Sequence, residues 1–468
     1  MTFDRLLESG SLRLIQSGDT RVLEASGPPV PGFPGPLEGV EVHVALGFYD
    51  ANDPLHAWDV AEWVDVVYVP ENPDLGLWAG GAPLVDISCD VVSVAISAGR
   101  DQPLDRFRAG TATVELDDPD GAFSPWRYAT DADRFAGVRP GIDLYVWVVA
   151  GGDTYPRFRG IVDSIVDEWP EQSAEEGTPH RVTFHAIDAF AALAAFNGLE
   201  VPPIGAGELT GARVGRIVAN AGLDVATDID AGTITVQATT LASAALEEAG
   251  LTTDTERGAL FVDRAGTLVF RDRNGLLTND AYTTVQATIG DDPTDGGPCY
   301  SRIALASDAS KIRNQVTVSR AGGSVATAQD LTSQALYGTR TYRRLDLIHT
   351  SDADSPTIAN EYLTTYAYAA NRVESLTVEL VANQDHVPPM LGLDVLHLIE
   401  VRRRAEGFEV VAKLQIQAFA ERITSDAWTI ELQTFAALPS NIFRVARWTD
   451  AVTIPEIEDQ WDSGLWGY

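Results

Sequence analysis

The sequence contains few of the residues that build cross-links or metal sites. Its 468 residues include two cysteines, Cys89 and Cys299, and two lysines, Lys311 and Lys413. Two cysteines are too few for a disulfide framework, and no cluster of cysteine and histidine indicates a zinc site. We therefore expect the chain to fold in a reducing cytosol.

Long apolar runs are also missing. No run approaches the roughly 20 residues that a membrane helix needs, so no stable membrane insertion is expected. Residues 1–10 lack the basic and apolar regions of a signal peptide. Hydrophobic residues still make up 45% of the chain, which predicts a globular protein. A chain of this length is too long for one ordinary core, and two to four domains are expected.

Basic residues are scarce, with 33 lysines and arginines against 68 acidic residues and a net charge of −35. This excess argues against a protein that binds phosphates tightly, because such affinity comes from lysine and arginine. It is compatible with DNA passing nearby, since an acidic channel wall would repel DNA and let it slide. A solubilising acidic surface explains most of the charge more simply.

The most informative stretch is residues 104–125, LDRFRAGTATVELDDPDGAFSP. Apolar and polar residues alternate over 111–116, which predicts a strand with one apolar face. We expect Gly110 to bend the chain into this strand. We expect the turn Asp117-Asp118-Pro119-Asp120-Gly121 to end it.

This stretch resembles the motif of siphophage minor tail proteins of the baseplate-hub kind. In that motif a Leu-Asp-Arg-Phe loop leads to an Ala-Gly-x-Ala-Thr-Val-x-Leu strand and an Asp-Gly-x-Phe-x-Pro turn. The matching residues are Leu104-Asp105-Arg106-Phe107, Ala109-Gly110 and Asp120-Gly121-Ala122-Phe123-Ser124-Pro125. The resemblance covers about residues 88–440. One departure is the penultimate strand, whose usual Gly-Ile-x-His reads Ala418, Phe419 and Glu421 here.

The resemblance implies a mainly β fold with two tail-tube-like β-barrel domains and a smaller α+β domain. We expect five parts: an N-terminal arm or linker at 1–36, which ends in a run rich in proline and glycine, a first β-barrel-like hub domain at 37–197, an α+β insert at 198–300, a second β-barrel-like hub domain at 301–440, and a tryptophan-rich C-terminal tail at 441–468.

Local patterns predict the individual elements. Strands are expected at 40–46, 64–69, 91–97, 141–149, 158–165, 181–188, 312–318, 372–380, 413–419 and 428–434, and a hairpin with Gly266 in its turn at 260–273. Helices are expected at 189–196 with Asp188 as N-cap, at 210–221 with Thr210 as cap and Gly222 as stop, at 241–250, and at 355–370 with Ser355 as cap.

No residue is assigned a catalytic, cofactor-binding or metal-binding role. The turn at 117–121 lacks the distal glutamate of a calcium loop, and none of the seven histidines has a zinc-site spacing. His185 and His397 are expected to be packed or surface residues within strands. Asp163 and Asp167 could mimic the carboxylate pair of a glycosidase, but an exposed strand edge is the simpler interpretation.

Three further segments invite a functional interpretation. The turn at 290–297 is expected to be flexible. The basic cluster Arg402-Arg403-Arg404 could contact an acidic partner, but a solvated hairpin tip is favoured. The aromatic residues of the tail are candidate interface anchors, because aromatic side chains are enriched in interfaces; they are Trp448, Trp461, Trp466 and Tyr468.

The resemblance implies a structural protein of the virion tail tip or baseplate, assembled in the host cytoplasm, with no enzymatic activity. It implies a homotrimeric ring whose other partners are the distal tail protein, the tape-measure protein and receptor-binding tip proteins, with phage DNA only in transit. Two alternatives are a tail-tip hydrolase of cell wall or glycan and a carbohydrate-binding adhesin. A hydrolase should show a cleft with convergent acids of shifted pKa. An adhesin should show exposed aromatic residues away from subunit contacts.

Overall fold

The computed structural model of the chain describes residues 14–17, 20–23, 35–47, 84–119, 121–126, 138–168, 180–197, 201–203, 207–223, 225–307, 309–368, 372–405, 408–436 and 443–447. The predicted strand at 64–69, most of the predicted arm at 1–36, and the aromatic residues of the tail lie outside these residues. A short hairpin of β1 (Leu14–Ser17) and β2 (Thr20–Leu23) is described near the N-terminus.

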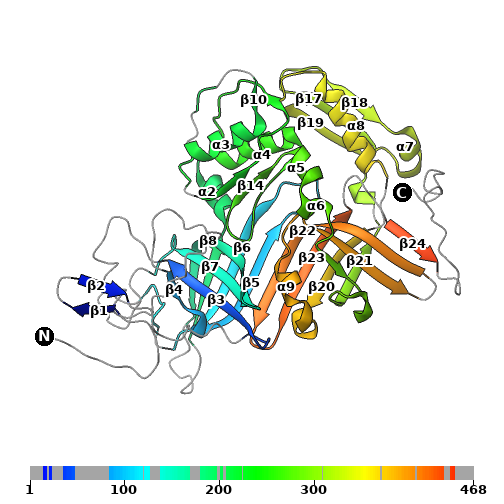
Figure 1. Cartoon of the computed structure of the whole chain (residues 1–468). Helices are drawn as coiled ribbons and strands as arrows, with labels where there is room; N and C mark the ends of the chain where they lie inside the picture. The colour runs from blue at the N-terminus through cyan, green and yellow to red at the C-terminus, as the bar shows by residue number, and fades with distance from the viewer. Residues whose placement is uncertain are drawn as a thin grey trace.

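Most described strands belong to one large sheet (Figure 1), with the order β16-β20-β23-β22-β5-β6-β9-β8-β7-β3-β4. Off this path, β15 pairs with β21, and β21 and β24 pair with β22. Their bounds are β3 Val40–Gly47, β4 Leu84–Asp86, β5 Val91–Gly99, β6 Arg108–Asp117, β7 Asp143–Ala150, β8 Asp153–Glu168, β9 Arg181–Ile187, β15 Ala287–Ile289, β16 Tyr300–Ala306, β20 Arg372–Glu379, β21 Leu398–Ala405, β22 Phe408–Thr424, β23 Trp428–Ala436 and β24 Phe443–Arg447.

The pairing of β5 with β22 joins the N-terminal and C-terminal parts of this sheet. The two strands run antiparallel, with Gly99 opposite Ala418 and Ser93 opposite Thr424. Gly99 has a φ of +130°, and a Cβ there would lie 2.3 Å from the Cα of Ala418, so only glycine fits this close approach. The expected closure of the strands into two barrels stays a prediction.

Strand β6 is the strand predicted from residues 111–116, and it lies between β5 and β9. Its Ala112, Val114 and Leu116 are buried, as the alternation predicts. Gly110 lies inside β6 and not before it, at the point where the pairing with β5 shifts register between Ser97–Thr111 and Gly99–Arg108. Its backbone N–H donates to Oδ2 of Asp188 at 2.5 Å, and a Cβ would lie 2.8 Å from that same oxygen.

The expected α+β insert lies against one side of the sheet (Figure 1). Helix α2 Ala189–Ala195 belongs to the expected first hub domain and packs beside the insert. The helices of the insert are α3 Thr210–Asn220, α4 Ala245–Glu256, α5 Arg273–Thr278 and α6 Asp280–Thr283, and its strands are β10 Glu208–Leu209, β11 Thr227–Ile229, β12 Thr235–Val236, β13 Ala259–Val262 and β14 Leu268–Arg271. The insert shares the apolar core of the large sheet, where the rings of Phe107 and Phe261 lie 5.4 Å apart. The fold is therefore mainly β with an α+β insert.

Several features predicted for helix α2 and for the insert are confirmed, and others are wrong. Asp188 caps α2 by accepting from the N–H of Phe190 at 2.9 Å, and Gly266 has the positive φ of the predicted hairpin turn. Thr210 does not cap α3, because its hydroxyl donates to the buried carboxylate of Glu256. The helix predicted at 241–250 begins later and ends later, as α4.

A second, smaller unit lies inside the expected second hub domain. It has its own core and a three-stranded sheet in the order β18-β17-β19. Its elements are β17 Gln315–Arg320, β18 Ala326–Gln329, β19 Thr341–Leu347, α7 Leu331–Tyr337 and α8 Asp354–Tyr366. The predicted cap Ser355 lies within α8, where its hydroxyl contacts Nε2 of the buried His349 at 2.9 Å.

The remaining described helices are short. They are α9 Val387–Leu391 and the 3₁₀ turns Ser88–Asp90, Pro293–Asp295, Ala309–Lys311, Leu380–Ala382 and Gln384–His386. Among the described residues, no helix has both the length and the apolar character needed to cross a membrane.

Candidate functional site

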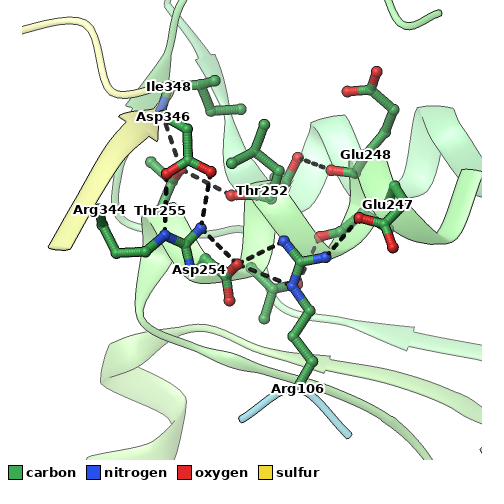
Figure 2. Close-up of polar contacts among 12 residues, drawn as sticks. Arg106, Glu247, Glu248, Thr252, Asp254, Thr255, Arg344, Asp346 and Ile348 are labelled. Atoms are coloured by element: carbon green, nitrogen blue, oxygen red, sulfur yellow. Dashed lines mark hydrogen bonds and ion pairs between the residues drawn. The ribbon is translucent and has the colours of Figure 1, made fainter. Parts of the chain in front are cut away.

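Arg106 connects the large sheet to the insert (Figure 2). It lies in the Leu-Asp-Arg-Phe loop that precedes β6, and its guanidinium reaches α4. Nε and Nη2 donate to Oδ2 of Asp254 at 2.9 and 2.7 Å, and Nη1 donates to Glu247 at 3.1 Å. Burial alone would lower the pKa of Arg106, but these two carboxylates raise it above its usual value.

Asp254 extends this connection to the small sheet. The same Oδ2 accepts from Nη2 of Arg344 on β19 at 2.9 Å, while Nε of Arg344 donates to Asp346 at 3.0 Å. Burial would lower the pKa of Arg344, but Asp254 and Asp346 raise it. One carboxylate of α4 therefore binds two arginines, one from the loop before β6 and one from β19 (Figure 2).

Gly250 makes room for Arg106 on the surface of α4. A Cβ at this position would lie 2.6 Å from Nη1 and 2.7 Å from Cζ of Arg106. Since Gly250 lies inside the helix, its role is close packing rather than helix termination.

Beside this network lies a cavity of about 930 Å³. Arg106, α4 and α8 contribute to its wall, so it forms where the large sheet, the insert and the small unit meet. Its apolar lining includes Leu104, Phe107, Leu246, Leu260, Leu276 and Leu277. Glu361 of α8 forms ion pairs with Arg257 and Arg273, which also line the cavity.

A buried ionic cluster also joins the large sheet to the insert at another place. Glu421 of β22 forms ion pairs with Arg157 of β8 and Arg264 of the β13–β14 turn, and it accepts from the indole N–H of Trp428 at 2.9 Å. Arg157 also donates to the carbonyl of Leu391 at 2.6 Å. Burial alone would raise the pKa of Glu421, but the two arginines lower it below its usual value.

The acidic turn at 117–121 is a capped turn. The carboxylate of Asp118 accepts from the backbone N–H groups of Ala122 and Phe123 at 2.7 and 3.0 Å, while Asp120 lies outside the described residues. In the described part of the chain, no group of three or more histidine, cysteine or acidic side chains is arranged to hold a metal ion.

Asp163 and Asp167 do not form a pair. Asp163 is exposed on β8, as the strand-edge interpretation expects, but that interpretation is wrong for Asp167, whose side chain is buried. Its two oxygens contact Nε2 of His180 and Oγ of Ser124, each at 2.5 Å. The carboxylate thus separates the serine from the imidazole, which is not the order of a nucleophilic triad.

The basic cluster and the turn predicted to be flexible contact each other. Arg404 of β21 donates to Asp295 at 2.7 Å through Nη1, and its backbone N–H donates to Asp291 at 2.7 Å. Arg402 also approaches Asp295, at 3.6 Å. The cluster does lie next to the end of the β21–β22 hairpin, and its side chains are about one third exposed, as predicted. The structure adds that these arginines pair with the acidic turn instead of being solvated only.

Only one of the two histidines that were predicted to lie within strands does so. His185 lies in β9 and contacts the hydroxyl of Thr113 at 3.2 Å. His397 precedes β21 instead of lying in a strand, and its Nδ1 accepts from the backbone N–H of Asp394 at 3.3 Å.

The fold is similar to that of several solved tail proteins. The chain is similar to a tail protein from Neisseria meningitidis MC58, with 12% identity and a TM-score of 0.52 over 85% of this chain and 96% of that one. The chain has the fold of a tail protein. Other similar structures are the 43 kDa tail protein of prophage MuSo2 from Shewanella oneidensis (13% identity, TM-score 0.49, 76% of this chain and 95% of that one) and prophage tail protein gp18 from Listeria monocytogenes (10%, 0.43, 77% and 93%). No protein-family model and no curated protein matches the sequence.

Within this tail-protein fold, sequence reasoning missed the residues that connect the parts. Arg106 was singled out as part of a motif, but its partner Asp254 was not. Glu421 was noted only as a departure from the hub motif. A charged residue in the middle of an apolar strand is the one signal that could have drawn attention to it.

Proposed function

We propose that the chain is a structural baseplate-hub or minor tail protein at the tail tip of a long-tailed phage or related particle. The observation that carries this proposal is the tail-protein fold over 85% of the chain. The continuous sheet, the shared core and the buried Arg157–Glu421–Arg264 cluster support it, because they make a stiff body suited to bearing load. In this role the chain links the tail tube to the tip.

The proposed assembly is a ring of three chains around a channel for DNA. The two hub segments, 37–197 and 301–440, would contribute neighbouring parts of the ring wall on either side of the insert. The net charge of −35 supports a wall that repels DNA and lets it slide. The proposed partners are the distal tail protein, the tape-measure protein and receptor-binding tip proteins.

Electron microscopy of the particle tests this proposal. A gold-labelled antibody against the purified chain should bind at the tail tip, and a reconstruction should show three copies around an acidic channel. Labelling of the head or the tube alone would overturn the tail-tip role. Six copies or one copy would overturn the ring of three, and an arginine-lined channel would overturn the sliding argument.

We also propose that the chain has no hydrolase activity. Support comes from the Ser124–Asp167–His180 contacts, whose order does not suit nucleophilic catalysis. The purified protein should release neither reducing ends from glycans nor peptides from peptidoglycan. Turnover that disappears when one aspartate or glutamate is replaced would contradict this.

A further inference from the structure

The cavity beside Arg106 has the size and the chemistry of a docking site. About 930 Å³ lies at the large end of the range of ligand pockets, roughly 300–1,000 Å³. Its rim is open to solvent, because Leu277 keeps 43% of its surface exposed and the side chains of Arg106 and Arg273 keep 37% and 41%. An incoming apolar group would therefore find both an entrance and a lining to contact.

The charge of the wall differs from that of the chain as a whole. Acidic residues outnumber basic ones by 68 to 33 in the sequence. In the cavity wall the balance is reversed, with arginines Arg100, Arg106, Arg108, Arg257 and Arg273 against acidic residues Asp105, Glu247, Asp254 and Glu361. Arg108 forms an ion pair with Asp101 through Nη2, but its side chain is 69% exposed at this wall, so its remaining N–H donors are accessible to a further carboxylate.

The segment that follows β24 is rich in aromatic and acidic residues, which complement the apolar lining and the arginines of the cavity. Residues 448–468, WTDAVTIPEIEDQWDSGLWGY, contain three tryptophans, one tyrosine and five acidic residues, with no lysine or arginine. Tryptophan side chains that fill apolar pockets contribute most of the affinity in many interfaces. Carboxylates placed among them would pair with the arginines of the wall.

The direction of β24 indicates which copy supplies this segment. Phe443 lies opposite Ala412 and Arg447 lies opposite Phe408, so β24 runs away from Gln415, the residue of β22 that lines the cavity. At the end of β24 the chain has moved about 20 Å past Gln415, at 3.2–3.4 Å per strand residue. The cavity of the same chain therefore lies about 20 Å behind the point where the tail begins, and this separation favours a tail supplied by a neighbouring copy.

We propose that residues 448–468 of a second copy of this chain dock in the cavity beside Arg106. The contact is heterologous, because one copy contributes the segment and the next contributes the cavity, and such contacts close into rings when the rotation allows it. The proposal does not depend on the tail-tip role, since it follows from the cavity and the segment alone.

Photo-crosslinking in the full-length chain tests the proposal. One version carries p-benzoylphenylalanine in place of Trp466, and a second, co-expressed version is unsubstituted and carries an affinity tag. After irradiation, the tagged chain should be linked to the untagged one, and mass spectrometry should locate the link at the cavity wall, near Leu246 or Leu277. Links within a single chain, or links only to segments outside the wall, would overturn the proposal.

A matched pair of cavity variants makes the test specific. Leu277→Asp places a negative charge at the exposed rim and should reduce the link between chains by about tenfold or more, because it opposes both the aromatic and the acidic groups. Leu209→Asp makes the same change at another exposed leucine of the insert, outside the cavity, and should leave the yield unchanged. Equal yields in the two variants, with both folded by circular dichroism, would overturn the proposal.

Discussion

Glu421 shows how a single carboxylate can connect distant parts of a chain. Its partners Arg157 and Arg264 lie 264 and 157 positions away, and all three side chains are buried. Breaking a buried ion pair on one side is costly, because the remaining charge stays in a medium that solvates it poorly. The cluster therefore fixes which surfaces of β8, β22 and the β13–β14 turn can meet.

Replacing Glu421 by glutamine should destabilise the protein strongly. The change keeps the shape but leaves two buried arginines without a negative partner, and a loss of about 3–5 kcal/mol in the free energy of unfolding is expected. Denaturant melts measure it. The control is Glu431→Gln on the neighbouring strand, where the side chain is exposed and the change should be small. Equal melts for the two variants would contradict the role of the cluster.

Asp188 makes the stability of the folded protein depend on pH. Burial raises the pKa of this carboxyl from 3.8 to about 7, although hydrogen bonds from Gly110 and Phe190 lower it in part. The folded state therefore holds a proton that the unfolded state has released, and stability falls as pH rises from about 4 to 7. Above pH 7 both states are ionised and the dependence ends.

Because asparagine does not titrate, the stability of the Asp188→Asn variant should lack this dependence on pH. From pH 5.5 to 7 the stability of the wild type relative to the variant should fall, by up to about 1.4 kcal/mol per pH unit, and it should be constant above that range. Denaturant melts at several pH values measure the difference. A constant difference over the whole range would show that Asp188 does not titrate there.

Among the elements, the strands were easier to predict than the helices. Alternation located β6 and β20 because each of these strands has one face in the core. Helix α4 was misplaced because Gly250 suggests a stop, whereas here it provides space for Arg106. The sequence around a glycine does not tell whether it ends a helix or accommodates a side chain 144 positions away in the chain.

Shortening the buried side chains of strand β6 should destabilise the protein. Val114 and Leu116 have no exposed surface, and the strand is paired on both sides. Replacing either by alanine should cost about 2–4 kcal/mol, because it removes buried methyl groups and leaves a cavity. Thr111→Ala on the exposed face is the control. Unchanged denaturant melts for both core variants would show that β6 is not part of the core.

For the whole molecule, the sequence predicted the mainly β class with a smaller α+β part, while the proposed domain bounds stay a prediction. It did not predict that β5 would pair with β22, because the pairing joins segments 319 positions apart and each strand alone shows only its own alternation. The cavity could not be predicted either, since its wall is assembled from strands, loops and helices of three units.

Self-association should increase with salt. Copies that each carry −35 repel one another at low ionic strength, and added salt screens this repulsion, with a Debye length of about 10 Å at 0.1 M. The few arginine–carboxylate pairs at a contact weaken at the same time, but the repulsion involves every charge. Light scattering from 0.05 to 0.5 M salt measures the mass. Dissociation as salt rises would mean that ionic pairs dominate the contact.

The pairing of β5 with β22 also constrains how the chain is made. Gly99 cannot pair until Ala418 has been synthesised, and a ribosome adds Ala418 roughly 15–60 s later at about 5–20 residues per second. During that interval β5 has an unpaired edge, which is a template for pairing with other nascent chains. Synthesis of this protein in quantity therefore depends on how well that edge is protected until the last fifth of the chain emerges.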